Sequence, residues 1–158
     1  MIGVLRRSDA APIAVSPQPR LADIPRLVRD SGHDVTLDLH GGQGQDWAEP
    51  TQRAAYRTVQ EALTNVSKHA PGAPVTVTVK PSRDALHVTV SNGPPATPPP
   101  TDLPTGGHGL ACLRERARLL GGNFHAGPAS AGGFRLEATL PNVQRHATSA
   151  LERRDGSA

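Results

Sequence analysis

Apolar side chains recur along this chain at helical spacing in three stretches, residues 21–31, 51–69 and 109–120. In the longest stretch, positions three and four apart fall on one stripe, because successive residues of a helix turn by about 100°. The residues of that stripe are Ala55, Val59, Ala62, Leu63, Val66 and Ala70. The pattern predicts three helices, and Pro25 fits the first turn of the first one, where proline is tolerated.

Apolar and polar residues alternate strictly in three other stretches, residues 33–39, 75–79 and 86–90. Alternation places every second side chain on the same face, so each stretch predicts a half-buried strand. Two more strands are predicted at residues 123–127 and 134–140, on either side of a pair of glycines.

Short turns join two pairs of predicted strands, one at residues 82–84 and one at Gly132-Gly133. Such turns join antiparallel neighbours. With the helices elsewhere in the chain, these hairpins favour an α+β fold, a two-layer sandwich with a mixed, mostly antiparallel sheet and about three helices on one face. No GxGxxG or GxxxxGK[ST] motif joins a predicted strand to a helix, which argues against the Rossmann and P-loop nucleotide folds.

Composition and charge limit the class of protein. The 158 residues include 16 glycines and 16 prolines, and the proline-rich loop at residues 91–108 is long enough to suggest a functional role. A single cysteine excludes an intrachain disulfide and a cysteine-rich zinc site. There is no apolar run of about 18 residues, as a membrane span requires, and the net charge of +3 is too small to indicate nucleic-acid binding. These features predict a soluble protein of a reducing compartment, the cytoplasm.

The same features predict where the domain begins and ends. Residues 1–20 are rich in Pro, Ser and Ala toward their end and predict a linker. Residues 21–141 carry all the predicted helices and strands. Residues 142–158 are polar and basic, which predicts a flexible tail.

The predicted helix 51–69 also carries a polar face. Glu61, Asn65 and Lys68 are spaced at i, i+4 and i+7 and share a narrow arc, with His69 at its edge. Carboxylate and amide oxygens suit Mg²⁺, which takes further ligands from substrate phosphates, and Lys and His can meet phosphate oxygens. The alternative interpretation is an ordinary solvated helix face.

Two other segments are candidates for binding. The first is the glycine-rich start of helix 109–120, Gly106-Gly107-His108-Gly109-Leu110, where free backbone N–H groups and the helix dipole favour an anion. The second is Ser91-Asn92-Gly93 at the end of a predicted strand. The alternative interpretations are a flexible loop before a helix for the glycine-rich segment, and a tight turn for the strand end.

In this order the motifs resemble the ATP-binding catalytic domain of two-component sensor histidine kinases of the nitrate-sensor and desaturase-sensor type, within the GHKL ATPase superfamily. Residues 60–70, QEALTNVSKHA, resemble the N box. Residues 107–116, GHGLACLRER, resemble the second glycine box, completed by LLGG at 119–122. Residues 133–141 resemble the last strand of the family. The resemblance covers residues 21–141 and implies an α/β sandwich of the Bergerat type.

The resemblance also implies roles for the candidate residues around ATP and Mg²⁺. By these roles Asn65 holds the Mg²⁺ that bridges the phosphates, and Glu61 is the catalytic residue, a polarising or base-like carboxylate. Lys68 and His69 approach the phosphates. Residues 94–106 form the ATP lid, and the nucleotide site includes the residues that follow it: Gly107, His108, Gly109 and Leu110.

One segment departs from the family pattern. The first glycine box of the family reads Asp-x-Gly-x-Gly, and its Asp receives the adenine amino group. Here Ser91 takes the place of the Asp and Pro95 that of the second Gly, with Asn92 and Gly93 following Ser91. Ser91, or Asn92 after a small shift, offers adenine a neutral acceptor, which binds more weakly than a carboxylate.

The second departure concerns the phosphoacceptor. Family members carry a histidine on a long dimerisation helix upstream, whereas none of the seven histidines here lies in such a signature. Residues 2–6 instead resemble the end of the second dimerisation helix. The resemblance therefore implies a protein-histidine kinase domain that phosphorylates a dimerisation helix of a partner or missing segment, for relay to a response regulator. Two alternatives stay open, a non-catalytic nucleotide-binding interaction module and a stand-alone serine kinase of the anti-sigma-factor type.

Overall fold

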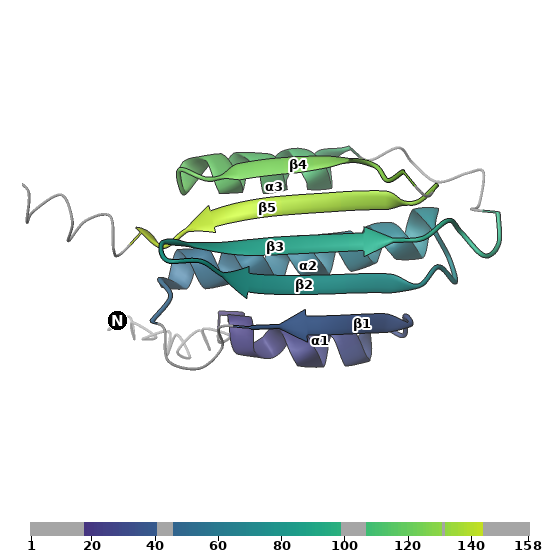
Figure 1. Cartoon of the computed structure of the whole chain (residues 1–158), viewed down its shortest axis with the longest axis horizontal. Coiled ribbons are helices and arrows are strands. Elements are labelled where there is room, and N and C mark those ends of the chain that lie inside the picture. The colour runs from purple at the N-terminus through teal and green to yellow at the C-terminus, as the bar shows by residue number, and fades with distance from the viewer. Residues whose placement is uncertain (1–17, 41–45, 99–106, 131, 144–158) are drawn as a thin grey trace, which may run out of the picture.

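The computed structural model describes residues 18–40, 46–98, 107–130 and 132–143, and its elements follow the predicted order (Figure 1). When the 3-10 turn at Leu21–Asp23 is counted with the first helix, each element lies within two residues of its expected bounds. The helices are α1 (Ile24–Asp30), which continues a 3-10 turn at Leu21–Asp23, α2 (Glu49–His69) and α3 (His108–Leu119). The strands are β1 (Val35–Leu39), β2 (Val75–Pro81), β3 (Ala85–Asn92), β4 (Asn123–Pro128) and β5 (Phe134–Pro141).

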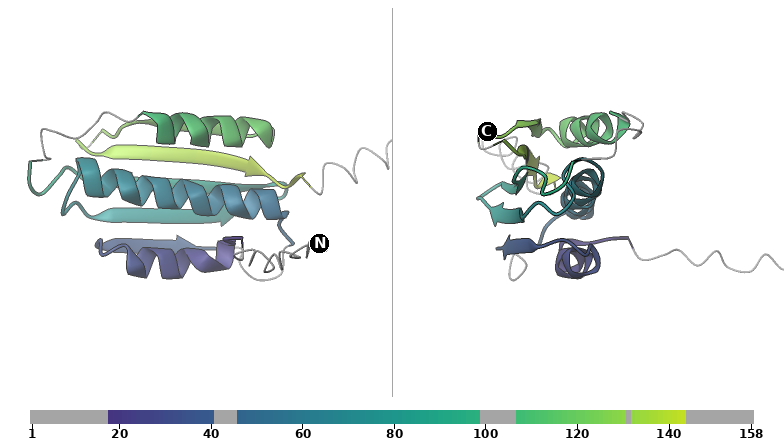
Figure 2. Two further views of the ribbon diagram at one scale, coloured as in Figure 1. Left: turned by 180° about the vertical axis from the view of Figure 1, so that it is seen from behind. Right: turned by 90° about the vertical axis from the view of Figure 1, so that its right-hand side faces the viewer.

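These elements form two layers, one sheet and one row of helices. The strands lie in the order β1-β2-β3-β5-β4. β1 and β2 are parallel, and all other neighbours are antiparallel. The helices cover one face of the sheet, as the edge-on view in Figure 2 shows. The expected α+β sandwich with a mixed, mostly antiparallel sheet is confirmed.

The connections between strands explain this pairing. The turn between β2 and β3 is closed by Ser82, whose backbone N–H donates to Ala85 O at 2.8 Å. The turn between β4 and β5 is closed by Ala129 N–H, which donates to Gly133 O at 2.9 Å. β1 and β2 are parallel, so the chain must cross the sheet between them, and α2 is the crossover.

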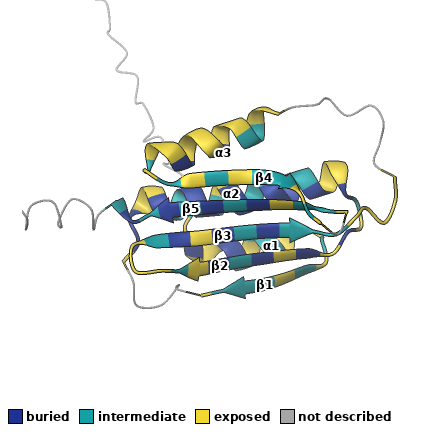
Figure 3. Cartoon of the chain, turned by 45° about the horizontal axis from the view of Figure 1, so that its top comes forward, coloured by how far each residue is buried: buried dark blue, intermediate teal, exposed yellow. Residues whose placement is uncertain are grey.

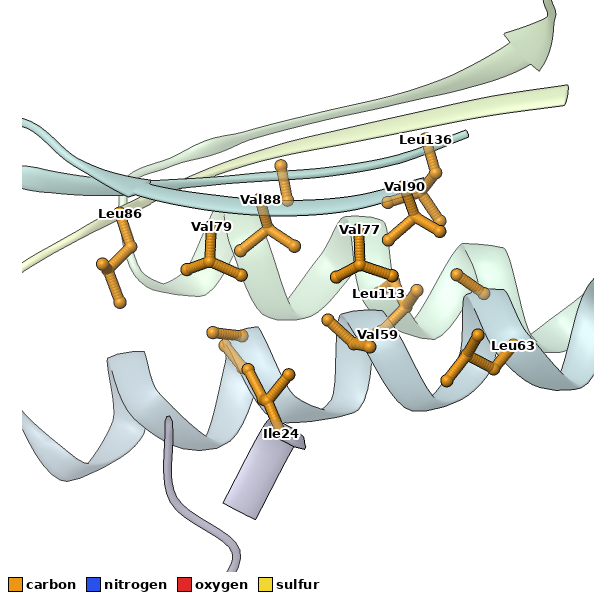
Figure 4. Packing of buried hydrophobic residues seen from close by; sticks show 14 of the residues in the cluster. Ile24, Val59, Leu63, Val77, Val79, Leu86, Val88, Val90, Leu113 and Leu136 are labelled. Carbon is orange, nitrogen blue, oxygen red and sulfur yellow. The ribbon is translucent and has the colours of Figure 1, made fainter. Parts of the chain in front are cut away.

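The core lies between the sheet and α2. Alternation turns the apolar side chains of the strands toward the helices, and Val77, Val79, Leu86 and Val88 are 0% exposed. These side chains point from the sheet toward the helices and share one core cluster with Val59 of α2 (Figure 4). The burial colours in Figure 3 alternate along the strands for the same reason. Each such buried side chain stabilises the fold by about 1.5–3 kcal/mol relative to exposure.

The folded domain extends past its predicted end. Asn142 is 3% exposed. Its Oδ1 accepts a hydrogen bond from Ala48 N–H at 3.0 Å, and its Nδ2 donates to Asp46 O at 2.9 Å. These bonds join the end of β5 to the segment that enters α2, where Trp47 is also buried. The prediction that the flexible tail begins at Asn142 is wrong, because that side chain is held inside the fold.

Several predicted segments lie partly outside the described residues. They are residues 1–17 of the linker, residues 99–106 of the lid, including Gly106, and residues 144–158 of the tail. Within the described ranges, no helix has both the length and the apolar character that crossing a bilayer requires.

Candidate functional site

A cavity of about 510 Å³ opens at one end of the sandwich. It lies where β3 ends and where β5 and α3 begin, beside the C-terminal half of α2, at the right-hand end of Figure 1. Its volume is in the range of about 300–1,000 Å³ that small-molecule sites occupy. The residues that line it are Ala62, Asn65, His69, Ala70, Val90, Asn92, Gly93, Pro95, Gly107, Leu110, Gly132, Gly133, Phe134 and Leu136.

The cavity brings together about half of the residues singled out in the sequence. Those in the lining are Asn65, His69, Asn92, Gly93, Gly107 and Leu110. Those outside the lining are Glu61, Lys68, Ser91, His108 and Gly109. The end of α2, the end of β3 and the start of α3, which are separate segments of the chain, therefore meet around one space.

On α2, only part of the predicted polar face reaches the cavity lining. Leu63 and Val66 are each 3% exposed and pack into the core, which directs the adjacent Asn65 to the rim of the cavity. Lys68 and His69 both lie on the exposed last turn of the helix, but only His69 reaches the lining. Of the two polar side chains that α2 contributes to the lining, Asn65 is half-buried and His69 is exposed.

The end of β3 separates Asn92 from Ser91. Because side chains alternate along a strand, Asn92 shares the inward face of Val88 and Val90, and Ser91 lies on the opposite face. Asn92 lines the cavity, and its Nδ2 donates to Gly93 O at 2.7 Å. That bond turns the amide acceptor, Oδ1, away from the carbonyl. The structure therefore favours Asn92, not Ser91, for the position that faces a ligand.

The start of α3 presents backbone amides to the cavity. Gly107 is its N-cap, has no side-chain capping bond, and lines the cavity together with Leu110. The first N–H groups of a helix have no intrahelical acceptor, and the helix dipole adds positive potential there. The side chain of His108 is exposed and outside the lining. This end of the cavity is suited to an anion.

Glu61 lies against α3, outside the lining itself. A methyl group built on Gly109 would fall on Glu61 Oε1 and Cδ, so the carboxylate sits directly beside the first turn of α3. Glu61 is also one helical turn before Asn65 on α2. The two side chains place hard oxygen atoms at neighbouring points along one edge of the site.

The start of β5 supplies four lining residues that the sequence analysis did not assign to the site, Gly132, Gly133, Phe134 and Leu136. A Cβ on Gly133 would collide with Asn92 O, so glycine is needed where β5 passes the end of β3. The Gly-Gly-Phe segment was visible in the sequence as a turn and a strand start. Its place at the cavity follows from the pairing of Asn92 with Phe134.

Charged pairs elsewhere on the surface are separate from the cavity. On α3, Arg118 donates to Glu115 at 3.0 Å, and this hydrogen bond lowers the pKa of the Glu115 carboxyl group.

In the described parts of the chain, no group of three His, Cys, Asp or Glu side chains could hold a metal ion. A metal at the cavity would therefore rely on few protein oxygens, such as those of Asn65 and Glu61. That donor set fits Mg²⁺, which keeps waters and binds substrate phosphates.

Comparison with known proteins shows which family the chain is related to. Residues 51–144 match the family of histidine kinase-, DNA gyrase B- and HSP90-like ATPases. Over 111 residues the chain is 31% identical to the sensor histidine kinase YxjM of Bacillus subtilis. That match covers 70% of this chain and 26% of YxjM, so the chain spans about a quarter of that relative.

Solved histidine kinase structures share the fold. The blue-light activated histidine kinase of Erythrobacter litoralis superposes with a TM-score of 0.59 at 19% identity, over 82% of this chain and 43% of that one. The ATP-binding domain of PrrB from Mycobacterium tuberculosis superposes with a TM-score of 0.53 at 25% identity, over 77% of this chain and 91% of that one. The chain therefore belongs to the histidine kinase-, DNA gyrase B- and HSP90-like ATPase family, as the ATP-binding domain of a histidine kinase.

Proposed function

We propose that this domain binds Mg²⁺-ATP in the cavity and transfers the γ-phosphoryl group to a histidine of a dimerisation domain, for relay to a response regulator. The observation that carries the proposal is one cavity lined by Asn65 of α2, Asn92 of β3 and Gly107 at the start of α3. These positions lie in the N box and the two glycine boxes that the sequence resembles.

The apolar part of the cavity suits the base. Val90 and Leu136 are 3% and 1% exposed and form part of its wall together with Phe134. A purine ring gains most from burying its faces against such side chains. Asn92 Oδ1 would accept a hydrogen bond from the adenine amino group, and as a neutral acceptor it would hold the base less tightly than a carboxylate.

The polar rim suits the phosphates. Asn65 Oδ1 would be the protein ligand of Mg²⁺, which when bound neutralises charge on the phosphate oxygens. The backbone N–H groups at the start of α3 would bind a phosphate oxygen. His69, and Lys68 beside it on the exposed last turn of α2, would supply further positive charge.

The proposed transfer needs positioning more than covalent chemistry. A bond forms between an imidazole nitrogen and the γ-phosphorus, the bond from that phosphorus to the bridging oxygen breaks, and ADP leaves. The imidazole loses its N–H proton, and Glu61 is the carboxylate proposed to accept it. The acceptor histidine belongs to a dimerisation domain, on a partner or on a segment outside this chain.

The test is to incubate the chain with Mg²⁺ and γ-labelled ATP, together with a purified histidine-bearing dimerisation hairpin of a related sensor kinase. Label that moves to the hairpin and is lost in mild acid supports phosphohistidine and the proposal. Label that survives mild acid would indicate a serine kinase. Clear ATP binding with no label on the hairpin would indicate an interaction module, and either of these last two results would overturn the proposed transfer.

A further inference from the structure

We infer that Gly109 is a positioning residue for Glu61: glycine at this point leaves the space in which the Glu61 carboxylate sits against the first turn of α3. The contact itself is independent of any ligand. Its consequence for the nucleotide rests on the proposed function, in which Glu61 is the catalytic carboxylate.

The contact is close along most of the glutamate side chain. A methyl group on Gly109 would overlap Glu61 Oε1 and Cδ and lie 3.1 Å from Cγ. Gly107, two residues earlier, offers a contrast, because a methyl group there would meet no atom within 4 Å. Of these two glycines of the second glycine box, only Gly109 is required by space.

Backbone conformation does not explain the glycine at this position. The described glycines with positive φ are Gly32, Gly72, Gly121 and Gly132, and Gly109 is not among them. Gly109 is the second residue of α3, where alanine is intrinsically the better helix former. A glycine in an ordinary helical conformation points to a neighbour that occupies the place of its side chain, and that neighbour is Glu61.

Electrostatics give the contact a second role. α3 has no acidic residue in its first turn, and its N-cap, Gly107, has no side chain to cap it. The negative charge that a helix N-terminus favours is brought instead by Glu61 from α2. The contact therefore joins the two helices that line the cavity with Asn65 on one side and Leu110 on the other.

Alanine at position 109 leaves two ways to relieve the overlap. Either the Glu61 side chain turns away from α3, or the first turn of α3 moves away from α2. Gly107 and Leu110, on either side of Gly109, line the cavity, so the second movement changes the shape of the site, and the first displaces the carboxylate. Both outcomes depend on the presence of the Glu61 side chain, and the movement of α3 weakens nucleotide binding by displacing Gly107 and Leu110.

The first test is a thermal-melting cycle on the full chain with four proteins: the parent, Gly109→Ala, Glu61→Ala and the double variant. In the parent background, Gly109→Ala should lower the melting temperature because of the overlap. In the Glu61→Ala background it should raise the melting temperature, because only the helix propensity of alanine remains. Gly107→Ala is the matched control and should give the same small shift in both backgrounds. A shift of one sign for Gly109→Ala in both backgrounds would overturn the inference.

The second test measures Mg²⁺-ATP affinity of the same four proteins by calorimetry. Gly109→Ala should weaken binding by about tenfold in the parent background and by less than about twofold when Glu61 is alanine, because interacting sites are not additive. An equal loss in both backgrounds would mean that Gly109 meets the phosphates directly, and would overturn the inference. If the parent chain itself binds no nucleotide, the proposed function fails, while the melting cycle still decides the Glu61–Gly109 relation.

Discussion

At the scale of single residues, the direction in which a side chain points decides whether it reaches the cavity. Asn65 reaches the cavity because Leu63 and Val66 on either side of it fill the core. Asn92 reaches it because it continues the inward row of Val88 and Val90. Two amides, one from a helix and one from a strand, thus face the same space, and each can be removed alone.

Replacing Asn65 should remove the metal dependence of nucleotide binding. Asn65→Ala takes away the only amide oxygen that α2 places in the cavity lining, so we expect Mg²⁺-ATP affinity to fall by about tenfold or more, toward the affinity for ATP without Mg²⁺. Calorimetry with and without Mg²⁺ measures both values. Gln60→Ala on the same helix removes an amide outside the lining and should change neither. Unchanged Mg²⁺-ATP affinity in Asn65→Ala would contradict the metal assignment.

The residue that meets the base can be identified with a matched pair of variants. Asn92→Ala removes the neutral acceptor proposed for the adenine amino group, and we expect the free energy of ADP binding to weaken by about 1 kcal/mol, roughly fivefold in affinity. Ser91→Ala, on the opposite face of β3, should leave ADP affinity unchanged. Titration of ADP without Mg²⁺ isolates the base from the metal. A larger loss for Ser91→Ala would reverse the assignment of the two residues.

At the scale of elements, α2 serves the core and the site at once. Its stripe of eight buried residues, from Thr51 to Val66, packs on the sheet. In its last two turns, the polar residues Asn65 and His69 line the cavity. Helix position is therefore set by packing with the strands, and the geometry of the site follows from the core.

Core packing on the strands predicts a large cost for a truncation in β3. Leu86 is 0% exposed, so Leu86→Ala should lower the free energy of unfolding by about 2–5 kcal/mol through lost burial and the cavity left behind. Leu119 on α3 is 75% exposed, and Leu119→Ala should change that free energy by less than about 0.5 kcal/mol. Urea denaturation followed by circular dichroism compares the two. Equal costs would mean that the β3 face is not the core.

At the scale of the whole molecule, contacts between distant parts of the chain close the sandwich. Asn142 follows β5 and bonds to Asp46 and Ala48, before α2. Thr51 Oγ1 donates to Pro141 O at 2.8 Å in the same region. The end of the last strand and the start of the central helix are thus fastened together, at the end of the sandwich opposite the cavity (Figure 1).

Removing this fastening should destabilise the fold without altering the site. Asn142→Ala leaves the buried Ala48 N–H without its acceptor and removes the donor to the Asp46 carbonyl, and we expect the free energy of unfolding to fall by about 1–3 kcal/mol. Asn123→Ala at the exposed start of β4 is the control and should cost less than about 0.5 kcal/mol. Urea titration gives both numbers, and ADP affinity at low temperature should match the parent. No loss of stability in Asn142→Ala would contradict the role of Asn142.

Much of the fold was predictable because the apolar pattern is strong and the turns are short. Alternation of apolar and polar residues indicated strands at β2 and β3, and the apolar stripe indicated a helix at α2. The short turns required antiparallel pairing of β2 with β3 and of β4 with β5. The parallel pairing of β1 with β2 was not predictable in this way, since it depends on where α2 returns the chain. Asn142 was missed because a lone polar residue after a strand has no local signal of burial.

The sequence by itself determined the elements, the α+β class and the candidates for the site, because hydrophobic spacing and glycine positions are local properties. Only the tertiary structure decided which candidates share a cavity. Strand register selected Asn92 over Ser91, core packing separated Asn65 from Lys68, and the approach of α3 to α2 set Glu61 against Gly109. These choices depend on distances between segments far apart in the chain, which no local pattern of residues records.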